Sequence, residues 1–158
     1  MKKELYIRDY RPADVQALAN IFFNTIHKIS IQHYTKKQLD VWAPNTSLET
    51  EGWKKKFLRT KPIIGTIEDK IVGFVEFEPN GHIDCFYCHH EWIRKGVGSA
   101  LMKEVLQRAQ NNYIHLIFSE VSITAKPFFE KWEFKIRAQQ TIVKKGVELT
   151  NFRMERIL

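Results

Sequence analysis

The residues best suited to chemistry lie where an expected strand, 82–89, leads to two glycines, Gly96 and Gly98, that open an expected helix. The first amides of a helix have no partner within the helix, and the helix dipole places partial positive charge there. Arg94 and Lys95 add positive charge beside these amides. We therefore expect this turn to bind phosphate, with the glycines letting a pyrophosphate approach the backbone. The alternative is that the glycines only close a tight strand-to-helix turn.

The turn matches neither of two common nucleotide-binding motifs. No third glycine follows at the spacing of a dinucleotide fingerprint, and the strands before the turn have the pattern of antiparallel hairpins rather than a β-α-β unit. A P-loop is excluded as well, because no G-K-[ST] follows.

The segment resembles instead the acetyl-CoA loop of the GNAT superfamily of N-acetyltransferases, whose pattern is [QR]-x-x-G-x-[GA]. The resemblance extends over the whole chain and includes the order of elements. Ile93 departs from it, because it stands where the pattern has Gln or Arg. The YafP-type subgroup of small bacterial members is the most similar, judged from Gln32-His33-Tyr34, Trp42-Ala43, the Gly-x-Gly loop, the stretch 123–130 and Asn151-Phe152-x-Met154.

The resemblance implies acetyl-CoA as co-substrate, held mainly by main-chain amides of the glycine loop and by the strand before it. Ser122 stands where relatives often have an asparagine that contacts CoA, and Glu133 where they usually have a glycine. The residues expected on the acetyl-CoA side are Phe86, Tyr87, Cys88, Arg94, Lys95, Gly96, Val97, Gly98, Ser99, Ser122 and Phe129.

Asp84 is the candidate general base. Strand alternation predicts that Asp84, Phe86 and Cys88 share one face, which would direct a carboxylate toward the thioester. The resemblance aligns Asp84 with an acidic residue that many relatives use as the base, and an ammonium must lose a proton before it can attack. The alternative is that Asp84 only pairs with a lysine or caps a strand end.

The general acid stays open. Relatives usually have a tyrosine where this chain has Phe129, and phenylalanine has no proton to give. Another group or water would supply the proton, or the thiolate leaves unprotonated, which a thiol pKa near ~8.5 tolerates. Tyr34 and Tyr87 are candidates only.

The resemblance places the acceptor beside the helical region that follows the first long helix. His33, Tyr34 and Trp42 lie there, and Asn151 on the last strand is a fourth candidate for binding the acceptor. An aromatic wall with one titratable group suits a small amine. The alternatives are that Tyr34 and Trp42 are core residues and that Asn151 bonds only to a neighbouring backbone.

Cys85 and Cys88 form a C-x-x-C near several histidines, which suggests zinc. We reject this interpretation, because residues three apart on a strand face opposite sides and no second pair of ligands follows. We expect free cysteines and no metal.

The elements that position these residues follow from periodicity and turn signals. We expect strands at 4–10, 63–68, 71–78, 82–89, 116–121, 134–144 and 147–158, and helices at 12–28, 39–42, 49–58, 97–109 and 124–131. Thr35 with Gln38, and Thr46 with Glu49, have the spacing of a capping box. The order predicts one α/β (α+β) domain over 1–158, with a mixed, largely antiparallel sheet of about seven strands and one parallel crossover.

Composition sets the remaining expectations. The chain has 158 residues, of which 44% are hydrophobic and 27% charged, and this excludes intrinsic disorder. The net charge is +7, but the lysine clusters at 36–37, 54–56 and 144–145 are short and separate, so we interpret most of them as solvated and expect no nucleic acid. With no apolar segment of membrane-spanning length and no signal-peptide pattern, we expect a cytoplasmic monomer or homodimer.

Together these features predict acetyl transfer from acetyl-CoA to a primary amine of a small molecule or peptide, by direct attack in a ternary complex. The alternative, supported by Phe129 and Ile93, is a non-catalytic CoA-binding or regulatory module.

Overall fold

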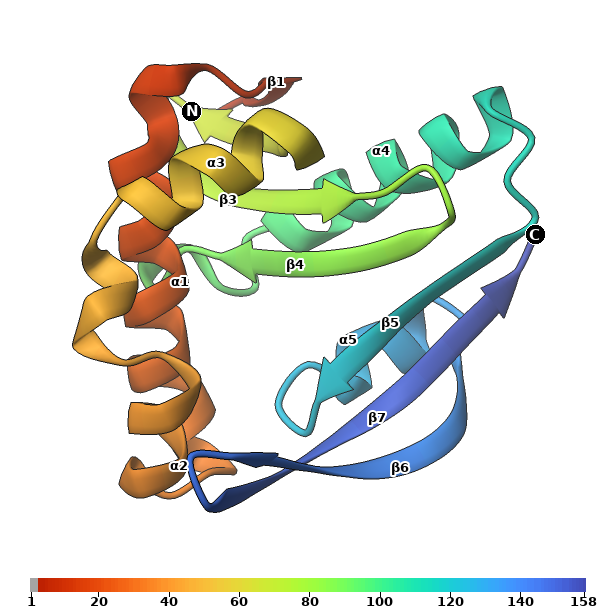
Figure 1. The fold of residues 1–158 in the computed structure, drawn as a ribbon. Coiled ribbons are helices and arrows are strands. Elements are labelled where there is room, and N and C mark those ends of the chain that lie inside the picture. The colour runs from red at the N-terminus through yellow and green to blue at the C-terminus, as the bar shows by residue number, and fades with distance from the viewer. Residues whose placement is uncertain (1–2) are drawn as a thin grey trace.

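The computed structural model describes residues 3–158, and its centre is a seven-stranded sheet in the order β1-β2-β3-β4-β5-β7-β6 (Figure 1). The strands are β1 (Leu5–Asp9), β2 (Ile63–Ile67), β3 (Lys70–Phe77), β4 (His82–Cys88), β5 (Leu116–Ser122), β6 (Lys135–Lys144) and β7 (Val147–Ile157). Neighbouring strands are antiparallel except for β4 and β5, which are parallel. The predicted mixed sheet with one parallel crossover is confirmed.

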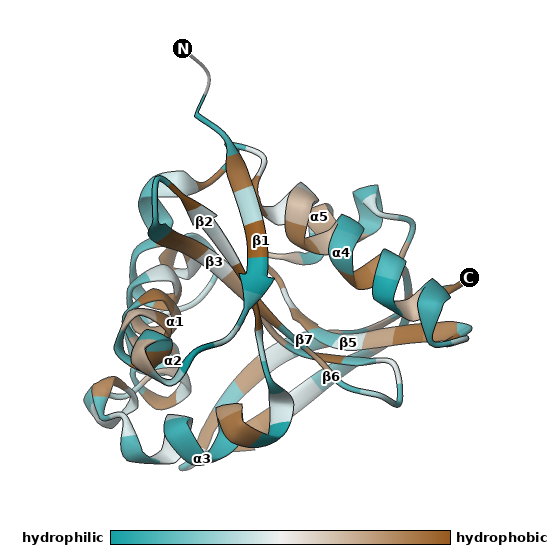
Figure 2. Cartoon of the chain, turned by 90° about the horizontal axis from the view of Figure 1, so that it is seen from above, coloured by the Kyte–Doolittle hydropathy of each residue, from teal (hydrophilic) through white to brown (hydrophobic). Residues whose placement is uncertain are grey.

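Helices cover both faces of the sheet. They are α1 (Val15–Ile29), α2 (Lys36–Trp42), α3 (Glu51–Thr60), α4 (Val97–Asn111) and α5 (Lys126–Lys131). Helices α4 and α5 share one apolar cluster with the sheet, whereas α1 and α3 pack in a second cluster on the other face. Figure 2 shows hydrophobic and hydrophilic residues alternating along α4, the amphipathic pattern that buries one side of a helix.

The pairing of β4 with β5 is short. It consists of His82 facing Phe118 and Ile83 facing Ser119, and the Ser119 hydroxyl donates to the Ile83 carbonyl at 2.8 Å. Figure 1 shows the two strands meeting near one end and diverging toward the other. From Asp84 onward, β4 is therefore paired only with β3. The sheet is split at its middle, where the sequence places its candidate site.

Turn and cap chemistry explains the element boundaries. Strands β6 and β7 are joined by Lys145-Gly146, both at positive φ, as the sequence predicts. The turn between β2 and β3 is at Glu68-Asp69, also at positive φ, one residue before its expected position.

One predicted capping box is confirmed and the other is wrong. Thr35 Oγ1 accepts from the Gln38 amide at 3.2 Å, and Gln38 Oε1 accepts from the Thr35 amide at 2.8 Å. Thr46 instead lies inside a short 3-10 helix, Asn45–Leu48, and α3 begins only at Glu51. Pro44 and Glu49, which flank that 3-10 helix, both have extended φ/ψ, so the 3-10 helix is separate from α3.

Helix α2 reaches the far half of the sheet. The Gln38 side chain donates to the Glu148 carbonyl at 2.9 Å, and Leu39 packs in one apolar cluster with Leu149 of β7. The segment between α1 and α3 therefore spans from β4 to β7 across the split in the sheet. Among the helices of residues 3–158, none has the length and apolar character required to cross a membrane.

Candidate active site

Helix α4 begins with amides that have no side-chain cap. Its N-cap residue, Gly96, has φ +85 in the left-handed region, where glycine is favoured, and no heavy atom lies within 4 Å of the position a Cβ would take. Lys95 Nζ lies 5.1 Å from the centre of the Trp92 ring, and Arg94 also has positive φ. Among residues 3–158, no side chain therefore caps the start of α4, and two cationic residues, Arg94 and Lys95, come just before it.

The first turn of α4 packs tightly against its surroundings. A Cβ on Gly98 would lie 3.0 Å from Phe128 Cε1 and 3.5 Å from Cys88 Sγ, so a larger residue here would have to displace the Phe128 ring by a few tenths of an ångström. Val97 is 1% exposed and its side chain presses on Gly73 of β3. The side chain of Val97 is therefore unavailable to a ligand, and its predicted role in binding acetyl-CoA would have to come from its main-chain amide. Ser99, half-buried, is the third residue of α4.

The free edge of β4 offers backbone groups toward the split in the sheet. The His89 amide donates to Val72 of β3 at 2.8 Å. Because successive amides along a strand point to opposite edges, the Phe86 and Cys88 amides point away from β3, toward the side on which β5 has diverged. The Cys88 carbonyl accepts from Thr25 Oγ1 of α1 at 2.8 Å, which fixes this end of the strand.

A β-bulge corrects the predicted face of Asp84. The register of β3 and β4 shifts between two facing pairs, Val75–Phe86 and Phe77–Ile83. Asp84 and Cys85 therefore lie opposite the single residue Glu76. Phe86 and Cys88 pack in the cluster of α4, whereas Asp84 pairs with a side chain from α3 on the other face. The alternation expected for Asp84, Phe86 and Cys88 is wrong because the extra residue reverses it.

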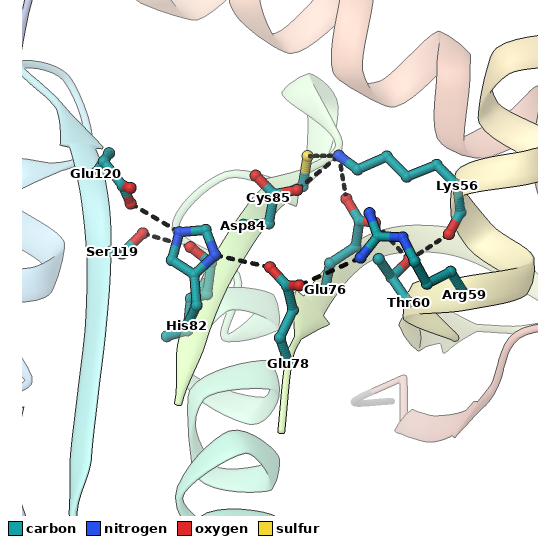
Figure 3. A network of polar contacts seen from close by, with 11 residues as sticks. Lys56, Arg59, Thr60, Glu76, Glu78, His82, Asp84, Cys85, Ser119 and Glu120 are labelled. Atoms are coloured by element: carbon teal, nitrogen blue, oxygen red, sulfur yellow. Dashed lines mark hydrogen bonds and ion pairs between the residues drawn. The ribbon is translucent and has the colours of Figure 1, made fainter. Parts of the chain in front are cut away.

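Lys56 of α3 contacts all three residues at the bulge (Figure 3). Its Nζ lies 2.8 Å from Asp84 Oδ2, 2.9 Å from Glu76 Oε1 and 3.6 Å from Cys85 Sγ. The Glu76 side chain is fully buried, and the Thr60 hydroxyl donates to its other oxygen. The alternative that Asp84 pairs with a lysine is therefore what the structure contains, and Lys56 is an exception to the solvated lysine clusters.

His82 bridges the two strands where the split begins. Its Nδ1 lies 2.7 Å from Glu78 Oε1, and its Nε2 lies 2.7 Å from Glu120 Oε2 on β5. Burial disfavours the charged imidazole, but the two carboxylates outweigh it and raise the pKa of His82 above its ordinary value. Figure 3 shows Arg59 continuing this chain to Glu78. The sequence analysis did not identify His82.

Tyr34 is a buried residue that joins β5 to β7. It is 5% exposed, accepts from the Ile123 amide at 2.9 Å, and donates to the Thr150 carbonyl. Burial raises the pKa of its hydroxyl, and the amide of Ile123 opposes that shift. Trp42 packs edge-on against it, with ring centres 5.3 Å apart. Tyr34 therefore links the end of β5 to β7 through its hydroxyl group. The hydroxyl proton is already used in the hydrogen bond to the Thr150 carbonyl.

The other candidates for acceptor binding, His33 and Asn151, lie near Tyr34. His33 is exposed, with Nδ1 2.9 Å from Thr124 Oγ1. Asn151 faces Ser122 across β5 and β7, and its buried Oδ1 has no hydrogen-bond partner within residues 3–158. The Ser122 hydroxyl accepts from the Ala125 amide at 3.0 Å and so helps begin α5.

The two cysteines lie on opposite faces of β4, as predicted. Cys85 packs with α1 and α3, and Cys88 packs with α4. Both are free thiols. Burial raises the pKa of Cys88 to about 12 and that of Cys85 well above its usual range, so both are held as neutral thiols.

Comparison with known proteins decides the family. The family model of the acetyltransferase (GNAT) domain matches residues 30–156, which is most of the chain. The protein belongs to the GNAT acetyltransferase family. It is 33% identical over 150 residues, 95% of this chain and 94% of the relative, to the uncharacterized N-acetyltransferase YafP of Escherichia coli K12. The expected YafP-type relationship is confirmed.

Solved structures agree on the fold. A GCN5-related N-acetyltransferase from Rhodopseudomonas palustris superposes with a TM-score of 0.92 at 23% identity, covering 100% of this chain and 98% of its own. The acetyltransferase yncA of Salmonella typhimurium, solved with its cofactor acetyl-CoA, has a TM-score of 0.73 at 17% identity, with 98% and 94% covered.

This GNAT protein has an aromatic cluster around Phe129. Phe129 is 3% exposed and its ring centre lies 5.0 Å from that of Phe134 and 5.8 Å from that of Phe86. Phe128, which the sequence analysis overlooked, lies between Phe86 and the first turn of α4. The two rings therefore connect the free edge of β4 to the glycine turn.

Proposed function

We propose that the protein transfers an acetyl group from acetyl-CoA to a primary amine of a small molecule or peptide, by direct attack in a ternary complex. The observation that supports this proposal is that the amides at the free edge of β4 lie close to the amides at the start of α4. The free edge of β4 ends at Cys88, whose Sγ is 3.5 Å from the Cβ position of Gly98 in the first turn of α4. One extended molecule with a pyrophosphate and an amide-bearing arm would use both sets.

Acetyl-CoA is the co-substrate that this arrangement favours. The amides of residues 96–99, with Arg94 and Lys95, provide positive charge for a diphosphate. The Phe86 and Cys88 amides supply donors to a pantetheine arm beside a split strand pair. The Salmonella typhimurium structure, which shares this fold, was solved with acetyl-CoA, which supports the same assignment here.

The chemistry needs a base and a polarised carbonyl. The amine nitrogen forms a bond to the thioester carbon, the carbon–sulfur bond breaks, and CoA leaves as a thiolate. Asp84, directly or through water, would take the proton that the ammonium loses, and the amide near Cys88 would stabilise the negative charge on the carbonyl oxygen. No residue is assigned as the acid, since Phe129 has no proton and Tyr34 donates its own to Thr150.

An assay of CoA thiol release over a panel of primary amines tests the proposal. The panel would include diamines, amino acids, aminoglycosides, peptides with free N-termini and peptides with one lysine. We expect at least one amine to give one thiol per acetylated product, with initial rates that indicate a ternary complex. Binding of CoA without release of thiol for any amine would favour the non-catalytic alternative.

A further inference from the structure

The bulge in β4 creates an unusual set of charges on the α3 side of the sheet. Two carboxylates, Glu76 and Asp84, and one thiol, Cys85, have their polar atoms within 4.8 Å of one another. Like charges this close repel strongly unless a cation lies among them. The ammonium of Lys56 provides that cation, reaching from α3 with only 27% of its side chain exposed (Figure 3).

Glu76 forms a buried ion pair with Lys56. Its carboxylate is fully buried, with one oxygen bonded by the Thr60 hydroxyl and the other 2.9 Å from Lys56 Nζ. A buried carboxylate that loses its only cation is strongly destabilised, so this pair fixes Lys56 in one place. Burial disfavours the charged ammonium, yet the carboxylates of Glu76 and Asp84 outweigh it and raise the pKa of Lys56 above its ordinary value.

The ion pair of Asp84 with Lys56 runs through Asp84 Oδ2. Lys56 Nζ lies 2.8 Å from Oδ2, and no group among residues 3–158 donates a hydrogen bond to Oδ1. The Asp84 side chain is 36% exposed, in contrast to the fully buried Glu76. Lys56 therefore anchors Asp84 at Oδ2, and the Asp84 side chain remains partly exposed.

We infer that Lys56 is a positioning residue: its ammonium, held by Glu76, fixes Asp84 Oδ2 and leaves Oδ1 to accept the proton of the acceptor amine. The inference rests on the proposed function. Lys56 touches neither substrate nor acetyl group and acts only through Asp84. Because Glu76 balances its charge, Lys56 orients the carboxylate without leaving an uncompensated positive charge beside it.

Other charged groups near Asp84 do not take this role. The titratable groups that face it are Lys56 from α3, Glu76 from β3, and His82, Cys85 and Tyr87 from β4 itself. Of these, His82 is already held by two carboxylates, Glu78 and Glu120. Lys56 is the group in direct ionic contact with Asp84.

The test removes Lys56 from a background in which Glu76 is already neutral. Glu76→Gln keeps the shape of the side chain, so Glu76→Gln and Lys56→Met/Glu76→Gln differ only in the lysine and leave no buried unpaired charge. Lys55→Met is the matched control, because Lys55 is the exposed neighbour on the same helix. A second double variant, Lys56→Gln/Glu76→Gln, and Lys56→Arg keep a hydrogen-bonding group at position 56.

We expect Lys55→Met to keep kcat within about threefold of the wild type, Lys56→Arg to keep more activity than either double variant, and Glu76→Gln to keep enough activity to serve as the reference. The two double variants should lose at least tenfold in kcat relative to Glu76→Gln, with the thermal shift induced by CoA unchanged. In the Asp84→Asn background the same removal of Lys56 should cause no further loss, because two residues that act as one unit are not additive.

Four results, in two pairs, overturn the inference. If the double variants match Glu76→Gln in kcat, or if the loss is repeated in full in the Asp84→Asn background, Lys56 does not act through Asp84. If no amine is acetylated by the wild type, or if Asp84→Asn is as active as the wild type, the proposed function or its base fails and this inference falls with it. The first pair of results leaves the proposed function intact, so the two failures are distinguishable.

Discussion

Gly96 offers a change of charge beside the proposed diphosphate site that leaves the packing of α4 intact. It has φ +85, and no heavy atom lies within 4 Å of its Cβ position. Asparagine and aspartate are the residues other than glycine that best tolerate this conformation, and they have nearly the same shape. Gly96→Asp and Gly96→Asn therefore differ mainly by one negative charge at the N-terminus of α4.

The size of the effect follows from Coulomb's law. A carboxylate about 6 Å from a phosphate, at an effective dielectric constant of about 20, costs about 3 kcal/mol, which weakens binding about 100-fold. CoA at about 100 times its wild-type dissociation constant stabilises the wild type by about 2.7 kcal/mol, and the Asp variant by only about 0.4 kcal/mol. In a chain of this length that is a melting shift of roughly 5 to 11 °C against roughly 1 to 2 °C.

Thermal unfolding with and without CoA measures the difference. Without CoA, Gly96→Asp should be at least as stable as Gly96→Asn, because a negative charge is favourable at a helix N-terminus. With CoA, Gly96→Asn should keep most of the wild-type shift and Gly96→Asp should lose most of it. Equal shifts in the two variants would refute the placement of the diphosphate at this turn.

Three other residues give further predictions. Tyr34→Phe leaves two backbone groups without a partner and should lower the free energy of unfolding by about 1–3 kcal/mol in urea titrations; an unchanged midpoint would contradict its bridging role. His33→Ala should raise the KM of the acceptor and leave the CoA-induced thermal shift unchanged, and loss of CoA binding would place His33 on the wrong side of the site. The raised pKa of His82 adds stability that is fully present below pH ~6.5 and is lost as pH rises through the folded pKa. Unfolding at pH 6 to 8.5 should show this decline in the wild type and not in His82→Gln, and equal slopes would exclude the link.

Periodicity and turn chemistry were sufficient to predict the sheet. The seven strands, the Lys145-Gly146 turn and the Thr35 capping box follow from local signals, and all are confirmed. The start of α3 was mispredicted because Thr46 lies inside a 3-10 helix and does not cap α3, although its spacing from Glu49 is that of a capping box. Local patterns thus predicted the elements better than their first residues.

The site was harder to predict, because its geometry depends on non-local contacts. A bulge shifts Asp84 to the other face of β4, and no residue type in β4 signals that extra residue. Gly98 is constrained by the ring of Phe128, which lies thirty positions away in sequence. Lys56 gave a usable signal: it lies three residues after Trp53 and one before the buried Phe57, which places it toward the core side of α3. A lysine there requires a buried partner, which a search for charge clusters alone does not reveal.

The initial rate of acetyl transfer, measured for the wild type and for Asp84→Asn with one saturating amine, tests the central claim most directly. The substitution keeps the shape of the side chain and removes its proton-accepting charge. We expect the wild type to release one CoA thiol per acetylated amine. We also expect a kcat lower by roughly 10²- to 10⁴-fold in Asp84→Asn, with CoA binding preserved. A wild type that binds CoA and acetylates no amine, or an Asp84→Asn variant as fast as the wild type, would contradict the central claim.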